Sequence, residues 1–331
     1  FVGVRLANDR LIRGSYAMCD APLGHIQTDK PATTHNYDSI VHPTRAASAT
    51  EVSEDGTVQI QYGTTMKTVK ASEADADFVP DVPIVTHEIG QYETYPNFDE
   101  IEKYTGSLKA RNFEVFRERL DEKGLLPLAN DYFESSGALA VQCYKEEMES
   151  IFRSQSLGGF QVLDIQDFSG QGTALVGVLD AFMDEKGICS PEEWREFCND
   201  AVILAEFEDY NLESGEGFAA EIRLANYRPS GVCGKKFTAV LTCECGTELA
   251  RLSGEVPKTA ENYIALGKLA AQIPEFEAPK KLTLALTVED TDIRNHYTLM
   301  AYPKRESVDT AGAYMFEKLD AEAEKLLGLG E

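Results

Sequence analysis

Val82-Pro83-Ile84-Val85-Thr86-His87-Glu88-Ile89-Gly90-Gln91 is the stretch that decides how the fold of this chain is interpreted. Its apolar run ends in a histidine and a glutamate, and a glycine follows two residues later. A parallel strand buried on both faces is apolar throughout, and in barrel enzymes the catalytic residues stand where such strands end. The stretch therefore predicts a buried parallel strand that delivers the Glu88 carboxylate to the mouth of a sheet or barrel. The alternative is an ordinary strand-end carboxylate that pairs with a lysine or an arginine.

A second apolar run of the same kind lies downstream, at residues 160–164, and it ends in Asp164 with Gln166 and Asp167 close behind. Neighbouring parallel strands end at one edge of a sheet, so we expect these side chains to join those of His87, Glu88 and Gln91. Carboxylates, amides and nearby aromatic rings suit a carbohydrate, whose hydroxyls exchange hydrogen bonds and whose apolar faces stack on rings. For Asp164 and Asp167, the capping of a local loop is an equally good interpretation.

The first two thirds of the chain alternate between strand-like and helix-like segments. Short strands are predicted at Thr57–Tyr62 and Met66–Val69. Apolar residues at helical spacing predict helices at Asn112–Lys123, at Leu125–Arg153 with a break near Gly137, and at Ala174–Met183. Ser190-Pro191-Glu192-Glu193 is a capping box that starts a helix ending at Cys198. This order of strands and helices is typical of an α/β barrel or of a doubly wound sheet.

The pattern changes after residue 203 to short strands with alternating polarity, separated by Gly, Pro and Asn turns. Such spacing predicts a β-sandwich. The expected strands are Val202–Phe207, Phe218–Ala225, Phe237–Cys243, Glu248–Leu252, Leu282–Val288 and His296–Tyr302. We therefore divide the chain into an α/β domain at 1–203, an all-β domain at 204–303, and a linker with the start of a further domain at 304–331. The terminal helix, Leu319–Glu331, and the opening without a methionine predict an internal piece of a longer protein; an exposed terminal helix is the alternative.

Composition excludes several classes of function. The 331 residues carry a formal net charge of −25, which argues against partners that need clustered Lys and Arg, such as nucleic acid and anionic membranes. No apolar run is long enough to span a bilayer. Gly170-Gln171-Gly172 lacks the third glycine of a dinucleotide loop, and no Gly-x-Ser-x-Gly elbow exists. We expect no cofactor.

The seven cysteines show no disulfide framework, which favours a reducing compartment. Cys243 and Cys245 would share one face of a strand, with Cys233 upstream. A zinc site is one interpretation of these three sulfurs, but no histidine lies near them, so packing cysteines and no metal are expected.

The two strand ends resemble the last two barrel strands of glycoside hydrolase family 2. Pro83–Gly90 is similar to the strand-seven signature of that family, and Gly159–Phe168 is similar to its strand-eight pattern, with Leu163 where tryptophan is usual. Further similarity, at Tyr95-Pro96-Asn97-Phe98 and Gly170–Ala174, is to a bacterial branch with a sandwich after the barrel. The resemblance implies the C-terminal portion of a (β/α)8 barrel followed by an immunoglobulin-like sandwich.

For function, the resemblance implies a retaining glycosidase with Glu88 as the nucleophile. His87, Gln91, Asp164, Gln166 and Asp167 would line the sugar subsite, and a carbohydrate would be the partner. A retaining enzyme also needs an acid/base carboxylate about 5–5.5 Å from the nucleophile. The family places it in an Asn-Glu pair, and this sequence contains no such dipeptide. We expect the pair to precede Phe1 in a longer protein, or to be lost.

Loss of the acid/base would leave a different class of protein, a non-catalytic carbohydrate-binding or scaffolding module. An incomplete barrel has open strand edges, through which a homo-oligomer could form. The unpaired cysteines slightly favour the cytoplasm, whereas the family has secreted and cytoplasmic members, so the compartment stays open.

Overall fold

The computed structural model describes residues 2–5, 17–20, 26–28, 57–62, 65–70, 84–153, 157–168, 172–228, 230–304, 316 and 318–329. Up to residue 88, and at 157–159, 161 and 329, the description covers the backbone and not the side chains. The predicted run Gly170-Gln171 therefore lies outside the described residues.

The first part of the chain forms a five-stranded mixed sheet in the order β1-β7-β6-β2-β3. The strands are β1 (Val2–Arg5), β2 (Ala17–Asp20), β3 (Ile26–Thr28), β6 (Ile84–Ile89) and β7 (Leu157–Val162). The three inner strands β2, β6 and β7 are parallel, whereas β1 and β3 pair antiparallel with their neighbours. The described strands therefore form an open sheet, and they do not show the portion of a closed barrel that the sequence predicted.

The strands β4 (Thr57–Tyr62) and β5 (Thr65–Lys70) pair antiparallel in a separate two-stranded sheet. The sequence predicted both strands to within one residue at each end, but not their pairing. The helical segments are η1 (Phe98–Lys103), α3 (Arg111–Glu122), η2 (Leu126–Leu128), α4 (Ala129–Arg153), α5 (Pro191–Phe197) and α6 (Ala321–Leu329). The capping box of α5 is present, because Ser190 and Glu193 each accept the backbone N–H of the other.

Helix α4 runs without a break through Gly137, contrary to the prediction. A side chain at this position would place its Cβ 2.5 Å from Cγ2 of Ile188, so the glycine allows a close contact and does not end the helix. The predicted helix at Ala174–Met183 is also absent. Residues of this segment take part in extended pairing instead, since Leu179 N donates to Ile165 O and Asp167 N donates to Leu179 O.

The second part of the chain is a β-sandwich. One sheet has the order β13-β10-β8 and the other has the order β12-β11-β14-β15-β9. The strands are β8 (Ala201–Glu206), β9 (Asn211–Glu213), β10 (Gly217–Asn226), β11 (Lys236–Cys243), β12 (Glu248–Glu255), β13 (Tyr263–Gln272), β14 (Lys280–Val288) and β15 (Arg294–Tyr302). The six predicted strands are present, and the prediction missed β9 and β13. Alternate residues of β11, β14 and β15 are buried, as expected for sheets that face each other.

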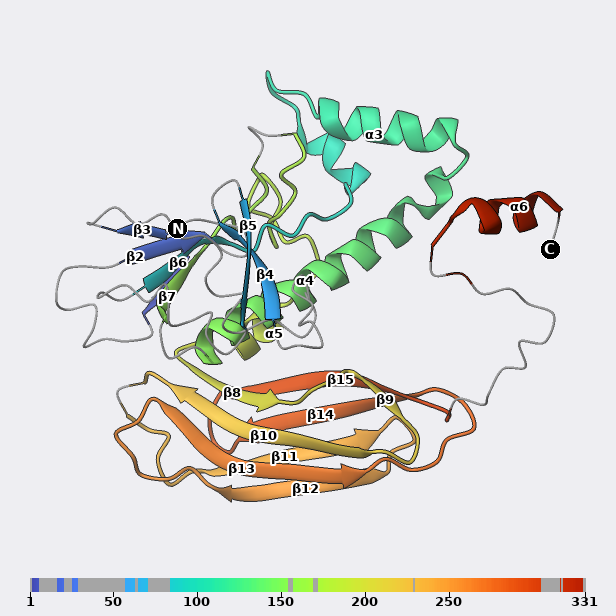
Figure 1. Cartoon of the computed structure of the whole chain (residues 1–331). Helices are drawn as coiled ribbons and strands as arrows, with labels where there is room; N and C mark the ends of the chain where they lie inside the picture. The colour runs from blue at the N-terminus through green and yellow to red at the C-terminus, as the bar shows by residue number, and fades with distance from the viewer. Residues whose placement is uncertain are drawn as a thin grey trace.

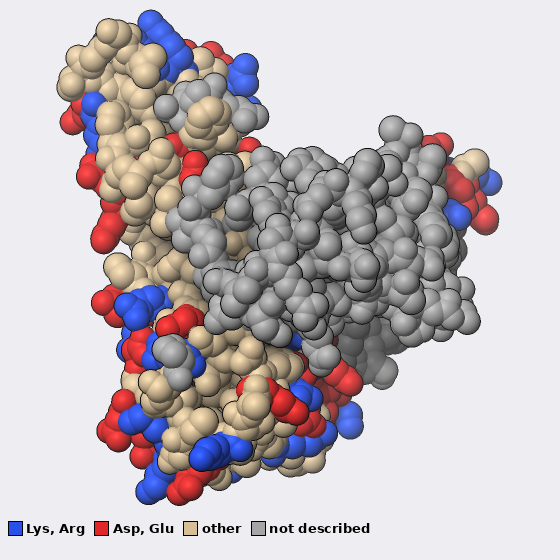
Figure 2. Space-filling view, turned by 90° about the vertical axis from the view of Figure 1, so that its left-hand side faces the viewer, with Lys and Arg blue, Asp and Glu red and all other residues tan. Residues whose placement is uncertain are grey.

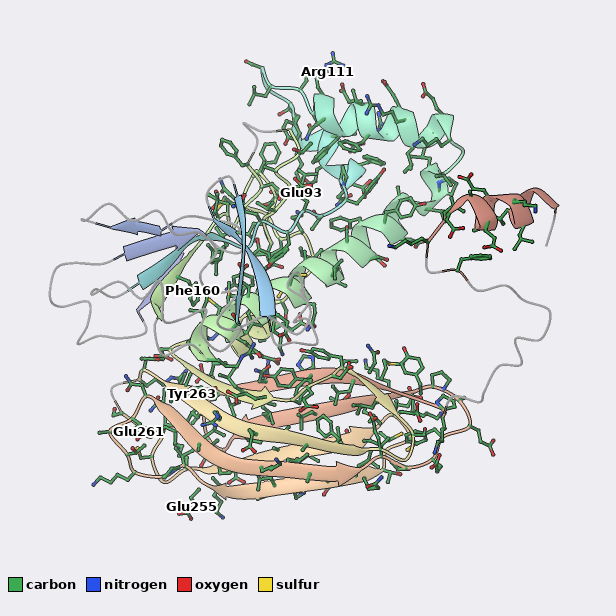
Figure 3. All side chains as sticks on the ribbon, viewed as in Figure 1. Glu93, Arg111, Phe160, Glu255, Glu261 and Tyr263 are labelled. Carbon is green, nitrogen blue, oxygen red and sulfur yellow. The ribbon has the colours of Figure 1, made fainter. Side chains whose placement is uncertain are left out.

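Strand β8 connects the two parts of the molecule, because it is buried on both faces. Its residues Ala201, Ile203 and Ala205 enter the sandwich core, whereas Val202 and Leu204 enter a second core with side chains of α4, α5 and β7. Figure 1 shows α4 crossing above the sandwich, near β8 and β15. Figure 3 labels Phe160 on β7, which contacts Phe152 of α4 in the second core.

Candidate functional site

The ends of β6 and β7 lie side by side. The two strands run parallel, Ile89 is paired with Val162, and Leu163 N donates to Ile89 O at 2.9 Å. The backbone therefore brings the end of the Glu88 strand and the start of the Asp164 segment to one edge of the sheet. This edge is where ligands bind in sheets with parallel strands.

The predicted site residues occupy different environments along this edge. His87 and Glu88 belong to β6, but their side chains lie outside the described ones. Gln91 follows the strand and is exposed. Asp164 is half-buried and its Oδ1 accepts from Ile165 N, which is the local capping that the sequence left open. Gln166 is half-buried and its backbone pairs with Leu179.

Buried side chains of α4 contact the loop that follows Glu88. Gly90 N donates to Glu147 Oε2 at 2.9 Å, and Tyr92 is hydrogen-bonded to the same carboxylate. Glu147 is buried, and loss of hydration raises the pKa of its carboxyl to about 7 despite these two hydrogen bonds. Tyr144, also on α4, packs its ring against Gly90. The position of the strand end therefore depends on buried groups of α4.

Asp167 is the best-anchored of the predicted residues. It is 3% exposed, and its Oδ1 accepts from Gly177 N at 2.9 Å and from Lys186 Nζ at 3.0 Å. The Lys186 ammonium also donates to Thr94 Oγ1 at 2.8 Å and to Gly177 O at 3.0 Å. Asp167 and Lys186 both lie between β7 and α5, and the hydrogen bond from Lys186 to Thr94 connects this segment with the loop after β6. Burial raises the pKa of Asp167, and Lys186 counteracts part of that rise.

A pocket opens beside Asp167, with a hollow of about 440 Å³ that includes its open mouth. Its walls come from η1, from α3 and from the loop that begins at Asp167. The polar and aromatic residues that line it are Glu100, Tyr104, Lys109, Asn112, Phe113, Asp167 and Phe168. Two labels in Figure 3 locate the elements that form these walls. Glu93 lies on the segment that leads to η1, and Arg111 is the first residue of α3. Two carboxylates thus meet in one hollow.

Sequence reasoning found Asp167 but missed Glu100, Glu147 and Lys186. All three are buried, at 4%, 5% and 8% exposure. Each lies among other charged residues in the sequence, where a solvated surface is the usual interpretation. Only the order of aromatic residues around Glu100, with Phe98 before it and Tyr104 after it, could have indicated a buried segment.

The cysteines do not share a strand face. Cys243 ends β11 and is buried, whereas Cys245 lies in the following turn and is exposed. Within the described residues, no three His, Cys, Asp or Glu side chains are grouped so that they could hold a metal ion.

Of the two cysteines described as exposed, Cys233 and Cys245, we expect Cys245 to be the more reactive. Hydrogen bonding with Cys243 and Thr247 lowers the pKa of the Cys245 thiol to about 7, so about half is thiolate at neutral pH. Iodoacetamide at pH 7 should modify Cys245 several-fold faster than Cys233, which is also exposed. Peptide mass spectrometry of a time course would measure both rates in one sample, and equal rates would contradict the expectation.

A family model for a domain of unknown function (DUF8488) matches residues 216–303, which lie within the sandwich. A search of curated proteins returns no match. The matched solved structures include a glycosyl hydrolase family 2 member from Bacteroides cellulosilyticus, at 12% identity and a TM-score of 0.21, covering 29% of this chain and 14% of that one. They also include Parabacteroides merdae β-glucuronidase, at 15% identity and a TM-score of 0.23, covering 32% and 14%.

A third match is of a different kind: the CARDB domain of the PF1109 protein from Pyrococcus furiosus, at 14% identity and a TM-score of 0.23, covering 32% of this chain and 88% of that domain. The matched segments span about a seventh of the length of the two glycosidase structures. TM-scores of this size carry no argument about the function of the chain.

None of the helices in the described part of the chain combines the length and the apolar character needed to cross a membrane. Figure 2 shows acidic and basic side chains interspersed over the described part of one face.

Proposed function

We propose that this chain carries part of the sugar-binding cleft of a retaining glycoside hydrolase similar to family 2. In this proposal the parallel strands β2, β6 and β7 belong to the C-terminal portion of a (β/α)8 barrel, and the sandwich is immunoglobulin-like. The observation that carries the proposal is the pairing of β6 with β7, which aligns the end of the Glu88 strand with Leu163 and Asp164. The order of these elements, ahead of a sandwich, agrees with the resemblance of their sequences.

The proposed reaction is a double displacement. The Glu88 carboxylate attacks the anomeric carbon, the bond to the leaving oxygen breaks, and a second carboxyl group protonates that oxygen. Water then attacks the glycosyl–enzyme ester, gives its proton to the second carboxylate and releases Glu88. His87, Gln91, Asp164 and Gln166 would contact sugar hydroxyls. Asp167, whose charge is compensated by Lys186, would position the loop.

The test is the replacement of Glu88 by alanine in the intact protein, assayed on a panel of 4-nitrophenyl glycosides. Turnover should be lost because no covalent ester can form. Added azide should restore 4-nitrophenol release and yield a glycosyl azide of inverted configuration, since a small anion can occupy the vacated space. Glu93→Gln, at an exposed position five residues away, should keep full activity. Unchanged turnover by Glu88→Ala would overturn the assignment.

A non-catalytic carbohydrate-binding module is the second candidate. Two observations favour it. The Asp167 carboxylate is hydrogen-bonded to Lys186 and Gly177, so it anchors the loop. The sequence also contains no Asn-Glu dipeptide. Calorimetric titration of the intact protein with a sugar panel separates the candidates. Sugar binding without turnover of any glycoside would support the module, whereas hydrolysis that depends on Glu88 would exclude it.

A further inference from the structure

Glu100 is a buried carboxylate with one oxygen that lacks a partner in the described part of the chain. The residue is 4% exposed, and its Oε2 has no hydrogen-bond partner among the described residues. An unpaired buried carboxylate is costly, because it has lost its hydration and gained no counter-charge. Glu100 is one of the residues that line the pocket, so a molecule bound there would lie beside this carboxylate.

The charged groups around Glu100 do not compensate it. Asp167 and Asp180 oppose its ionisation, whereas Lys186 and Lys103 favour it. Both lysines are already committed, since Lys186 donates to Asp167 and Lys103 donates to Asp180 and Asp184. Desolvation is the largest influence, and together these groups raise the pKa of Glu100 to about 7. Neither of these two lysines is therefore left to pair with Glu100 when it is ionised.

The walls of the pocket indicate what kind of cation fits. Tyr104, Phe113 and Phe168 contribute aromatic rings, and Leu108 and Leu175 contribute apolar surface. Aromatic faces attract cations and also pack against an apolar body. A divalent metal would need several oxygen ligands, and the described residues offer no group of three. An organic cation matches both the carboxylate and the rings.

We propose that this pocket binds a small organic amine, whose ammonium group pairs with the Glu100 carboxylate and whose apolar body packs against the aromatic walls. The net charge of −25 raises the local concentration of cations around the protein. Lys109, an exposed residue that also lines the pocket, is the one cation on the described lining that opposes binding. Its long side chain can extend into water from the mouth.

Binding of an amine is then linked to the release of a proton. Only the ionised form of Glu100 forms the ion pair, so a bound amine lowers the pKa of that carboxyl from about 7. Between pH 6 and pH 8 the ionised fraction of Glu100 rises about tenfold, and the affinity for an amine that stays protonated rises by the same factor. A neutral alcohol would show no such increase, because it can accept a hydrogen bond from protonated Glu100.

Benzylamine and benzyl alcohol are the matched probes, since they differ in charge and little in shape. Isothermal titration calorimetry at pH 6, 7 and 8, in two buffers of different ionisation enthalpy and without primary amines, measures affinity and proton release. Benzylamine should bind about tenfold more tightly at pH 8 than at pH 6, release close to half a proton at pH 7, and exceed benzyl alcohol at least tenfold at pH 8.

Glu100→Gln keeps the shape of the side chain and removes its charge. It should weaken benzylamine binding at least tenfold and abolish the pH dependence, whereas Glu102→Gln, at an exposed position of η1, should bind as the native protein does. Unchanged thermal melting of both variants, followed by Trp194 fluorescence, excludes misfolding. Equal binding of the two probes, stronger binding at pH 6, or no benzylamine binding would overturn the proposal. None of these outcomes depends on Glu88.

Discussion

Replacing Glu149 by alanine should lower the free energy of unfolding by about 3–5 kcal/mol, because the change leaves buried groups without their counter-charge. Glu149 is fully buried between α4 and the sandwich. Its carboxylate accepts from Asn295 Nδ2 and from the Tyr297 hydroxyl, each at 2.8 Å. Lys145 and Arg153 lie 3.8 Å and 3.4 Å from the same carboxylate, and their side chains are 8% and 11% exposed.

The network around Glu149 couples the two parts of the chain. Asn295 also donates to Ile203 O at 2.8 Å, and Lys145 donates to Asn295 Oδ1 and His296 O. The alanine variant should therefore loosen the contact between α4 and the sandwich as well as lower stability. Urea unfolding followed by Trp194 fluorescence and by far-ultraviolet circular dichroism would detect both effects. In the native protein the fluorescence and circular dichroism transitions should occur at nearly the same urea concentration, whereas in the variant they should separate.

Two control variants make the expectation specific. Glu134→Ala removes an exposed carboxylate from the same helix and should change stability by no more than about 0.5 kcal/mol. Glu149→Gln keeps one acceptor oxygen, for either Asn295 or Tyr297, and should cost less than alanine. The expectation fails if Glu149→Ala and Glu134→Ala unfold at the same urea concentration.

Replacing Gly90 by alanine should cost about 2–5 kcal/mol, for two separate reasons. The backbone at Gly90 has φ +86°, a conformation that costs other residues about 1–2 kcal/mol. The new Cβ would also lie 1.9 Å from Cε1 of Tyr144, and such overpacking costs about 1–3 kcal/mol. Displacement of the loop would in addition stretch the hydrogen bond from Gly90 N to Glu147.

Gly124→Ala is the matched control for this variant. Gly124 has φ +68°, but a Cβ there would meet no atom within 4 Å, so only the conformational cost of about 1–2 kcal/mol applies. The difference between the two variants isolates the contact with Tyr144. Trp194, the single tryptophan, lies 5.4 Å from the Tyr144 ring and reports on this region during urea unfolding. Equal losses of stability would mean that the contact contributes nothing.

Local patterns predicted the segments whose structure depends on neighbours in sequence. The capping box at Ser190 and Glu193 predicted the start of α5, because its hydrogen bonds are made within four residues. Alternating polarity predicted β11, β14 and β15, since one face of each is buried in the sandwich. The apolar run before His87 predicted β6, which lies between two parallel neighbours.

The errors occurred where distant residues overrode local preference. Strand β13 contains Ala, Leu, Lys and Gln, which favour helix in isolation, yet it pairs with β10 along its whole length. The segment at Ala174–Met183 has helical spacing, but its backbone groups bond to Ile165, Asp167 and Phe168. Neither pairing can be predicted from the sequence of the segment alone.

The sequence by itself determined the strand that contains Glu88, the second strand that ends before Asp164, and the sandwich that follows them, because hydrophobic periodicity is a local property. Only the tertiary structure decided that β6 and β7 are neighbours, and that Lys186 anchors Asp167. It also decided that Glu100, Glu147 and Glu149 are buried. The sequence does not distinguish a glutamate in water from one in a core, because the environment of the side chain is set by residues brought together from distant positions in the chain.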